Sequence, residues 1–225
     1  MRKHMQRDLE NLRRDLLALA SLVEETILKA TRALQLRDVG LAREVIASDQ
    51  QIDREENLLN EECLKILALH QPVAIDLRLI ASTMMITTDL ERMGDLAEEI
   101  AERALSLASP PHLRVPAKLQ RMTDLTTLMV RQSLDSFVNL NKEQAQAVLR
   151  MDDEVDRYNV EIIQEVMQEM RASPALIEAG LSMFSATRHL ERIADHATNI
   201  AEDVIYLIEG EIVRHRTACP RPHPH

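Results

Sequence analysis

Four pairs of acidic residues carry the chemistry that this sequence suggests. In each pair two carboxylates stand four residues apart, a spacing that places both on one face of an α-helix. The pairs are Asp49 with Asp53, Glu91 with Asp95, Asp152 with Asp156, and Glu191 with Asp195. Like charges at this spacing destabilise a helix, and carboxylates that gather disfavour ionisation unless a cation compensates. A hard divalent or trivalent metal bound by carboxylate oxygens provides that compensation, so we interpret the eight residues as metal ligands.

The acidic pairs lie in an internal duplication. Residues 89–102 and 189–202 are identical at eight of fourteen positions, including the Glu-Arg-x-x-Asp centre of each segment. Upstream, residues 49–54 match residues 152–157 at an offset of 103. Helical patterns connect these segments, so three helices are repeated as a unit. We therefore predict an all-α fold of two tandem three-helix bundles related by internal duplication, with six long helices.

Counting from each pair to the nearest turn predicts that the pairs meet. In the first copy the pair midpoints, residues 51 and 93, stand about 20 residues on either side of a turn at 71–72. In the second copy the midpoints, 154 and 193, stand 19 and 20 residues from a turn at 173. An antiparallel hairpin then brings both pairs to the same height, which gathers four carboxylates in each bundle.

Turn and break residues divide the chain into the elements that position the pairs. We expect five helices over about residues 4–36, 39–70, 73–107, 116–140 and 142–171. Ser173 is expected to cap a sixth, with Pro174 at its first position, that reaches about residue 211. Ser109-Pro110-Pro111 breaks the chain between the repeats. The predicted organisation is a first bundle at 1–108, a linker at 109–116, a second bundle at 117–212 and a disordered tail at 213–225.

The third and sixth helices repeat one apolar seam. Its residues follow a 3-4-3-4-3 spacing, which is typical of helices that pack at shallow angles. The seam consists of Leu90, Met93, Ala97, Ile100, Ala104 and Leu107 in the first copy and Leu190, Ile193, Ala197, Ile200, Val204 and Leu207 in the second. Glu91 and Asp95 point about 150° away from the middle of this seam. We therefore expect both carboxylate clusters on the outside of the bundles.

Composition narrows the classes of function. The 225 residues include four Gly and only 2% aromatic residues, which suits long amphipathic helices, and no Gly-rich phosphate loop is present. A net charge of −10 disfavours a nucleic-acid partner. The longest charge-free runs, such as 79–88, reach about half the length that spans a bilayer, so membrane association would be peripheral. Two cysteines are too few for a disulfide framework and no signal peptide is evident, which indicates the cytoplasm.

Other interpretations of the acidic residues remain open. The pairs could form a solvated acidic face, with ordinary ion pairs to Arg54, Arg92, Arg157 and Arg192. Residues one or two turns further along are possible outer ligands, namely Glu98, Glu102, Asn199 and Glu202. An inward-facing di-iron centre is disfavoured, because its Glu-x-x-His motif has Gly94 or Ala194 in place of the His. His196 lies on another face than Asp195, so we expect it at the surface or between helices.

The duplicated motif resembles the PhoU family. The resemblance rests on Leu90–Asp95, its copy Leu190–His196, the trailing segment Asn199–Glu202, and Asp76-Leu77-Arg78, and it covers about residues 5–212. It implies a non-enzymatic adaptor that negatively regulates the phosphate-starvation response by coupling a phosphate ABC transporter ATPase to a sensor histidine kinase. It also implies metal clusters on the eight paired acidic residues, and homodimers. The first copy departs at Leu96, where the second has His196.

Two further functions compete with the adaptor. One is a helical protein that stores or buffers metal, and the other is a metal-dependent phosphohydrolase. The hydrolase is disfavoured because no separate acid, base or phosphate-binding group accompanies the carboxylates. Iron, manganese, magnesium and zinc are all open as the metal.

Overall fold

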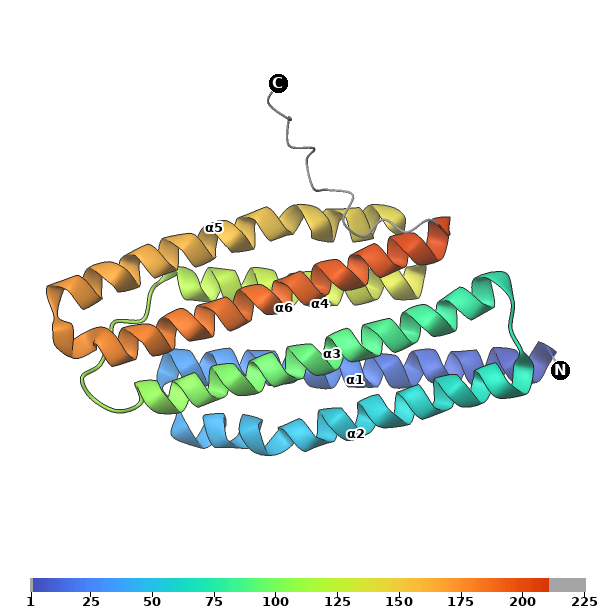
Figure 1. The fold of residues 1–225 in the computed structure, drawn as a ribbon, viewed down its shortest axis with the longest axis horizontal. Helices are drawn as coiled ribbons and strands as arrows, with labels where there is room; N and C mark the ends of the chain where they lie inside the picture. Colours follow the sequence, from blue (N-terminus) through green and yellow to red (C-terminus); the bar gives the residue numbers. More distant parts are fainter. Residues whose placement is uncertain (1, 211–225) are drawn as a thin grey trace, which may run out of the picture.

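Six long amphipathic segments form six helices in the computed structural model, which describes residues 2–210 (Figure 1). They are α1 (Arg2–Leu36), α2 (Val39–His70), α3 (Ala74–Leu107), α4 (Lys118–Asn139), α5 (Lys142–Ala172) and α6 (Ile177–Glu209), with a 3-10 turn, η1 (Pro174–Leu176), before α6. The all-α prediction is confirmed, and α4 begins two residues later than expected. The tail expected at 213–225 lies outside the described residues.

Helix ends repeat along with the helices. Asp38 caps α2 by accepting a hydrogen bond from the Leu41 amide at 3.0 Å, and Asn141 caps α5 by accepting one from the Gln144 amide at the same distance. These caps are 103 residues apart, the offset of the duplication. The expected cap at Ser173 is wrong in detail. Its amide instead donates to the Glu169 carbonyl and ends α5, its side chain makes no capping hydrogen bond, and Pro174 opens the 3-10 turn.

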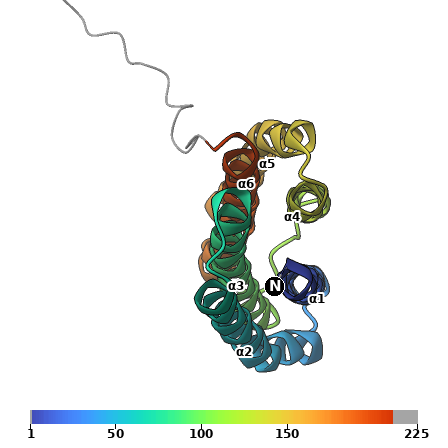
Figure 2. The same cartoon turned by 90° about the vertical axis from the view of Figure 1, so that its right-hand side faces the viewer.

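The helices form two three-helix bundles joined side by side. Helices α1, α2 and α3 make the first bundle, and α4, α5 and α6 make the second. Viewed end on, α5, α6, α3 and α2 follow one another in a curved row, and α4 and α1 lie along one side of it (Figure 2). Helices α3 and α6 run antiparallel and pack against each other more extensively than any other pair, whereas α1 and α4 touch less. The motif-bearing helices are therefore at the centre of the molecule.

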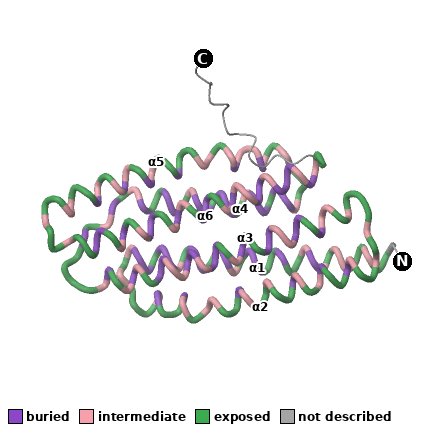
Figure 3. Tube along the Cα trace, viewed as in Figure 1, coloured by how far each residue is buried: buried purple, intermediate pink, exposed green. Residues whose placement is uncertain are grey.

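One hydrophobic core runs through both bundles. All twelve seam residues are buried, as is Cys63. Buried positions lie on the helix faces that meet, and exposed positions lie on the outer faces (Figure 3). Residues 108–117 connect α3 to α4, and Arg37 ties this connection to α1 by donating to the Leu113 carbonyl. Among the described residues no helix is long and apolar enough to cross a membrane.

Candidate metal centres

The first cluster lies where α2 faces α3. Carboxylate oxygens of Asp49 and Asp53 on α2 and of Asp95 on α3 all lie within 4.8 Å of one another. The pKa of the Asp49 carboxyl is raised first by burial and then by the charges of Asp53 and Asp95. Burial, followed by the charge of Asp95, likewise raises the pKa of Glu91, one turn away on α3. As counted from the turn, Asp49, Asp53 and Asp95 lie together, and all four side chains including Glu91 are half-buried. Their role as metal ligands stays a prediction.

A close approach of the two helices brings these carboxylates into range. Gly94 precedes Asp95 and faces Ile52, which precedes Asp53. A Cβ atom at position 94 would lie 2.8 Å from Cδ1 of Ile52, closer than real Cβ atoms come. In the second copy the equivalent residues are Ala194 and Val155, both fully buried. Compared with the first copy, the second has one methyl group more on the motif helix and one carbon fewer on the facing helix. The total side-chain volume at this contact is therefore the same in both copies.

The second cluster lies between α5 and α6, and its carboxylates are more exposed to solvent than those of the first cluster. Burial, then the charges of Asp156 and Asp195, raise the pKa of Asp152 to about 6. The pKa values of Glu191 and Asp195 are also raised, by burial first and then by neighbouring carboxylates that include Asp156. The charges of these carboxylates therefore act on one another across the helix pair. Within residues 2–210, however, three carboxylate oxygens meet within 4.8 Å only in the first cluster.

The donor set of both clusters suits a hard cation. The Oδ1 atoms of Asp49 and Asp152 are buried and have no hydrogen-bond partner, and these two residues are equivalent in the duplication. Glu191 Oε2 is also buried without a hydrogen-bond partner. Leaving a buried acceptor unsatisfied costs about 1–3 kcal/mol. Oxygen ligands with uncompensated negative charge are what magnesium, manganese or iron ions bind, so the residues fit a metal.

The arginines near the clusters do not neutralise them. Arg92 lies 3.4 Å from each residue of its own pair, with Nε near Glu91 Oε2 and Nη1 near Asp95 Oδ2. These are long separations for ion pairs, and the Arg92 side chain is exposed. A shorter ion pair joins Arg188 Nη1 to Glu191 Oε1 at 2.8 Å. It was not predicted, although the i,i+3 spacing of the two residues is visible in the sequence. Of the expected pairings, Arg157 contacts Glu154 instead of the paired residues, and Arg54 donates to the Gln50 carbonyl. The interpretation as a purely ion-paired face therefore accounts for only part of the charge.

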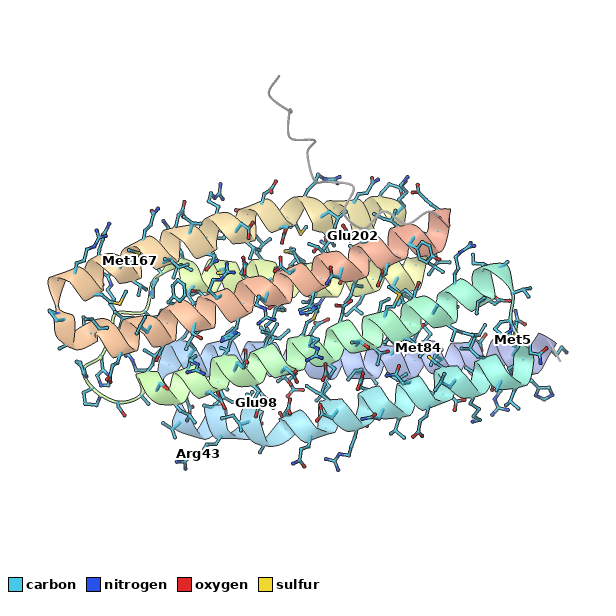
Figure 4. The ribbon with its side chains drawn as sticks, viewed as in Figure 1. Met5, Arg43, Met84, Glu98, Met167 and Glu202 are labelled. Carbon is cyan, nitrogen blue, oxygen red and sulfur yellow. The ribbon has the colours of Figure 1, made fainter. Side chains whose placement is uncertain are left out.

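The residues expected as outer ligands do not all lie beside a cluster. Burial and the charge of Asp49 raise the pKa of Glu98, which lies on the side of α3 that faces α2 (Figure 4). The charges of Asp95 and Asp53 raise it further, so Glu98 belongs to the surroundings of the first cluster, whereas Glu102 is exposed and lies 3.4 Å from Arg103. Glu202 is half-buried on the α5 side of α6 (Figure 4). Asn199 instead points away from the second cluster, because its Nδ2 donates to Asp89 of α3 at 3.4 Å.

His196 is an inter-helix residue, as expected. Its Nδ1 lies 2.8 Å from Oδ1 of Asp89, across the contact between α6 and α3. Asp89 was not predicted as its partner. The pairing depends on how α6 is rotated against α3, and residues 107 positions apart give no pattern that reveals it.

Comparison with known proteins gives matches over nearly the whole chain. The family model of the PhoU domain matches twice, at residues 16–104 and 119–204, which are the two copies of the duplication. A phosphate-specific transport system accessory protein PhoU homolog of Pseudomonas putida is 42% identical over 92% of this chain and 82% of its own length. A homolog of the same name from Aquifex aeolicus is also 42% identical, over 93% and 95% of the two chains.

Solved structures agree with the sequence relatives. The crystal structure of PhoU from Pseudomonas aeruginosa superposes with a TM-score of 0.86 at 40% identity, and covers 92% of this chain and 99% of its own. The phosphate transport system regulatory protein PhoU from Streptococcus pneumoniae gives a TM-score of 0.87 at 32% identity, with coverage of 93% and 99%. The six-helix architecture is therefore shared with experimentally determined structures, and these relatives are named as regulatory or accessory proteins.

Proposed function

This chain belongs to the PhoU family, and on that premise we propose that it is a negative regulator of the phosphate-starvation response attached to a phosphate-specific transport system. The observation that carries the proposal is the match of both repeats, over more than nine tenths of the chain, to transport-system accessory proteins. The chain would act as an adaptor that contacts the ATPase of the phosphate ABC transporter and a sensor histidine kinase. When phosphate is plentiful, this contact would hold the kinase in its inactive or phosphatase state.

The architecture supports an adaptor better than an enzyme. Two bundles fused along α3 and α6 present separate outer helices, α2 and α5, each beside its own carboxylate cluster. Neither cluster is accompanied by a nucleophile with its base, and the flanking side chains are arginines and further carboxylates. We propose a cytoplasmic site of action, peripheral contact with the membrane, and a homodimer as the assembled form.

We further propose that the paired acidic motifs bind metal. Asp49, Asp53, Glu91 and Asp95 would hold the first cluster, and Asp152, Asp156, Glu191 and Asp195 the second. Bound cations would supply fixed positive charge that offsets carboxylate repulsion and links α2 to α3 and α5 to α6. The unpartnered buried oxygens of Asp49 and Asp152 support this assignment. Each cluster offers only four paired carboxylates, half-buried in the first cluster and partly exposed in the second, which favours a small constant number of ions over storage. A storage protein is the alternative.

Deletion of the gene tests the regulatory proposal. We expect phosphate-starvation genes to be expressed in abundant phosphate, and expression of the chain in trans to restore their repression. Under the same conditions the tagged protein should co-purify with the transporter ATPase and the sensor kinase. Full repression in the deletion strain would refute the proposal. Elemental analysis separates the alternative, because metal content far above a few ions per chain indicates storage.

A further inference from the structure

Helices α3 and α6 each serve two contacts at once. One face of each helix presents a Glu-x-x-x-Asp pair toward α2 or α5, in its own bundle. The other face packs against its counterpart in the opposite bundle, with the two helices antiparallel. Any shift of α3 along its axis therefore moves the first cluster and the inter-bundle contact together.

Polar contacts cross the inter-bundle contact beside the proposed ligands. His196, directly after Asp195, places Nδ1 2.8 Å from Oδ1 of Asp89, two residues before Glu91. Only 19% of the His196 side chain and 12% of the Asp89 side chain are exposed, so the pair is largely shielded from water. Asn199 donates to the same oxygen of Asp89.

A second contact crosses at the other end of the motif. His189 stands two residues before Glu191, and its Nδ1 lies 2.8 Å from Oε2 of Glu99, four residues after Asp95. The two atoms form no hydrogen bond, and burial lowers the pKa of His189, so this is a close polar contact and not an ion pair. The Nε2 atom of the same ring lies 2.9 Å from Oγ of Ser185, which orients it. Each motif is thus flanked by a residue that contacts the opposite bundle.

These contacts break the symmetry of the duplication. The residues equivalent to Asp89, Leu96 and Glu99 in the second copy are His189, His196 and Asn199. A symmetric contact would place the same side chains on both helices. Here both carboxylates belong to α3 and both imidazoles to α6, while Leu96 is a buried apolar residue. The asymmetry makes the two central helices complementary and fixes their register against each other.

We propose that the Asp89–His196 and Glu99–His189 contacts couple the two metal clusters, so that occupancy of one raises the metal affinity of the other. The four side chains act as positioning residues, because their close contacts are made across the interface between α3 and α6, although the charges of Glu99 and His196 also act on Asp95 and Asp195. A cation between α2 and α3 fixes α3, and the two contacts carry that restraint to the turns of α6 that hold Glu191 and Asp195. Coupling of this kind is reciprocal, and typical values are about 5- to 150-fold in affinity. The inference rests on the proposed metal binding.

Calorimetric titration of the full chain with Mn²⁺ alone tests the coupling. One cluster is disabled with Asp49→Asn and Asp53→Asn, and the other with Asp152→Asn and Asp156→Asn. We expect disabling either cluster to weaken the other by roughly five- to tenfold. The effect should fall in the background of His196→Leu, which introduces the residue type of the first copy, or of Asp89→Asn, and it should vanish when Glu99→Ala is added to remove the second contact.

A matched control shows whether loss of coupling is specific to the contacts between the bundles or follows from removing any histidine–carboxylate contact. His70 Nε2 lies 2.9 Å from Oδ2 of Asp8, joining α2 to α1 within the first bundle. His70→Leu should leave the coupling intact. Hydrogen exchange provides a measurement with the interface unchanged. Mn²⁺ added to the chain with a disabled second cluster should slow the exchange of α6 amides, and Asp89→Asn combined with Glu99→Ala should remove that protection.

The outcomes distinguish the two proposals. Failure of the wild-type chain to bind Mn²⁺ overturns the metal clusters and their coupling together. Binding at both clusters with affinities that do not depend on each other overturns the coupling alone. Coupling that survives His196→Leu combined with Glu99→Ala also overturns it, because the contacts would then contribute only to packing.

Discussion

Burial and mutual repulsion together keep the paired carboxyl groups harder to ionise than free ones. Asp152 has a pKa of about 6, and the pKa values of Asp49, Glu91, Asp95, Glu191 and Asp195 are all raised. A raised pKa in the folded state means that the fold binds these protons more tightly than the unfolded chain does. Their contribution to stability is therefore fully present below the unfolded values and is lost as the pH rises through the folded ones.

Asp152→Asn makes this effect measurable. In chelator, the variant should be more stable than the wild type by about 1 kcal/mol near pH 7, allowing for the solvent screening of a half-exposed group. The difference should disappear near pH 4, where the wild-type carboxyl is protonated. With Mn²⁺ near pH 7 the order should reverse, because the amide is a poorer ligand. Urea unfolding in the three conditions provides the measurement, and a difference independent of pH would contradict the assignment.

At the scale of helix pairs, the contact of Gly94 with Ile52 sets how closely α2 approaches α3. Alanine at position 94 raises helix propensity by about 1 kcal/mol but forces Ile52 aside, and overpacking of this kind costs about 1–3 kcal/mol. We expect Gly94→Ala alone to be neutral or destabilising. In combination with Ile52→Val, the pairing found in the second copy, the same change should stabilise the fold.

Chemical denaturation of the two single variants and the double variant tests this exchange. The coupling energy between the two positions should be about 1 kcal/mol in favour of the double variant. If Gly94→Ala stabilises the wild-type chain and the Ile52→Val variant by the same amount, the close approach of position 94 to Ile52 has no energetic role. Metal affinity provides a second measurement, because separating α2 from α3 in Gly94→Ala should weaken the first cluster.

The elements differ in how far the sequence predicts them. Helix periodicity and the duplication are enough for the six helices, the buried seam and the meeting of Asp49 and Asp53 with Asp95, because all of these depend on spacing within a hairpin. Asn199 was expected near the second cluster, yet it contacts Asp89. Such contacts depend on the rotation of α6 against α3, which is set by the packing of the whole seam. A single sequence contains no periodic signal for that rotation.

At the scale of the molecule, the two bundles complete each other's core. Helix α3 packs more extensively against α6 than against any other helix, so a fragment of residues 1–108 exposes the side of α3 that α6 covers in the full chain. The duplication gives this fragment a substitute partner, a second copy of itself. In that homodimer, however, Asp89 and Glu99 of both chains would meet without the imidazoles of His189 and His196, and like charges brought together in a shielded contact are unfavourable.

Separately produced fragments 1–108 and 109–210 should therefore prefer each other. We expect each fragment alone to self-associate weakly, and an equimolar mixture to form a one-to-one complex whose helix content approaches that of the intact chain. Light scattering after size-exclusion chromatography measures the masses, and circular dichroism measures the helix content. His196→Leu in the second fragment should reduce the preference for the mixed complex, whereas His70→Leu in the first should not. Stable monomers of either fragment would contradict this expectation, because each bundle would then need no partner across α3 and α6.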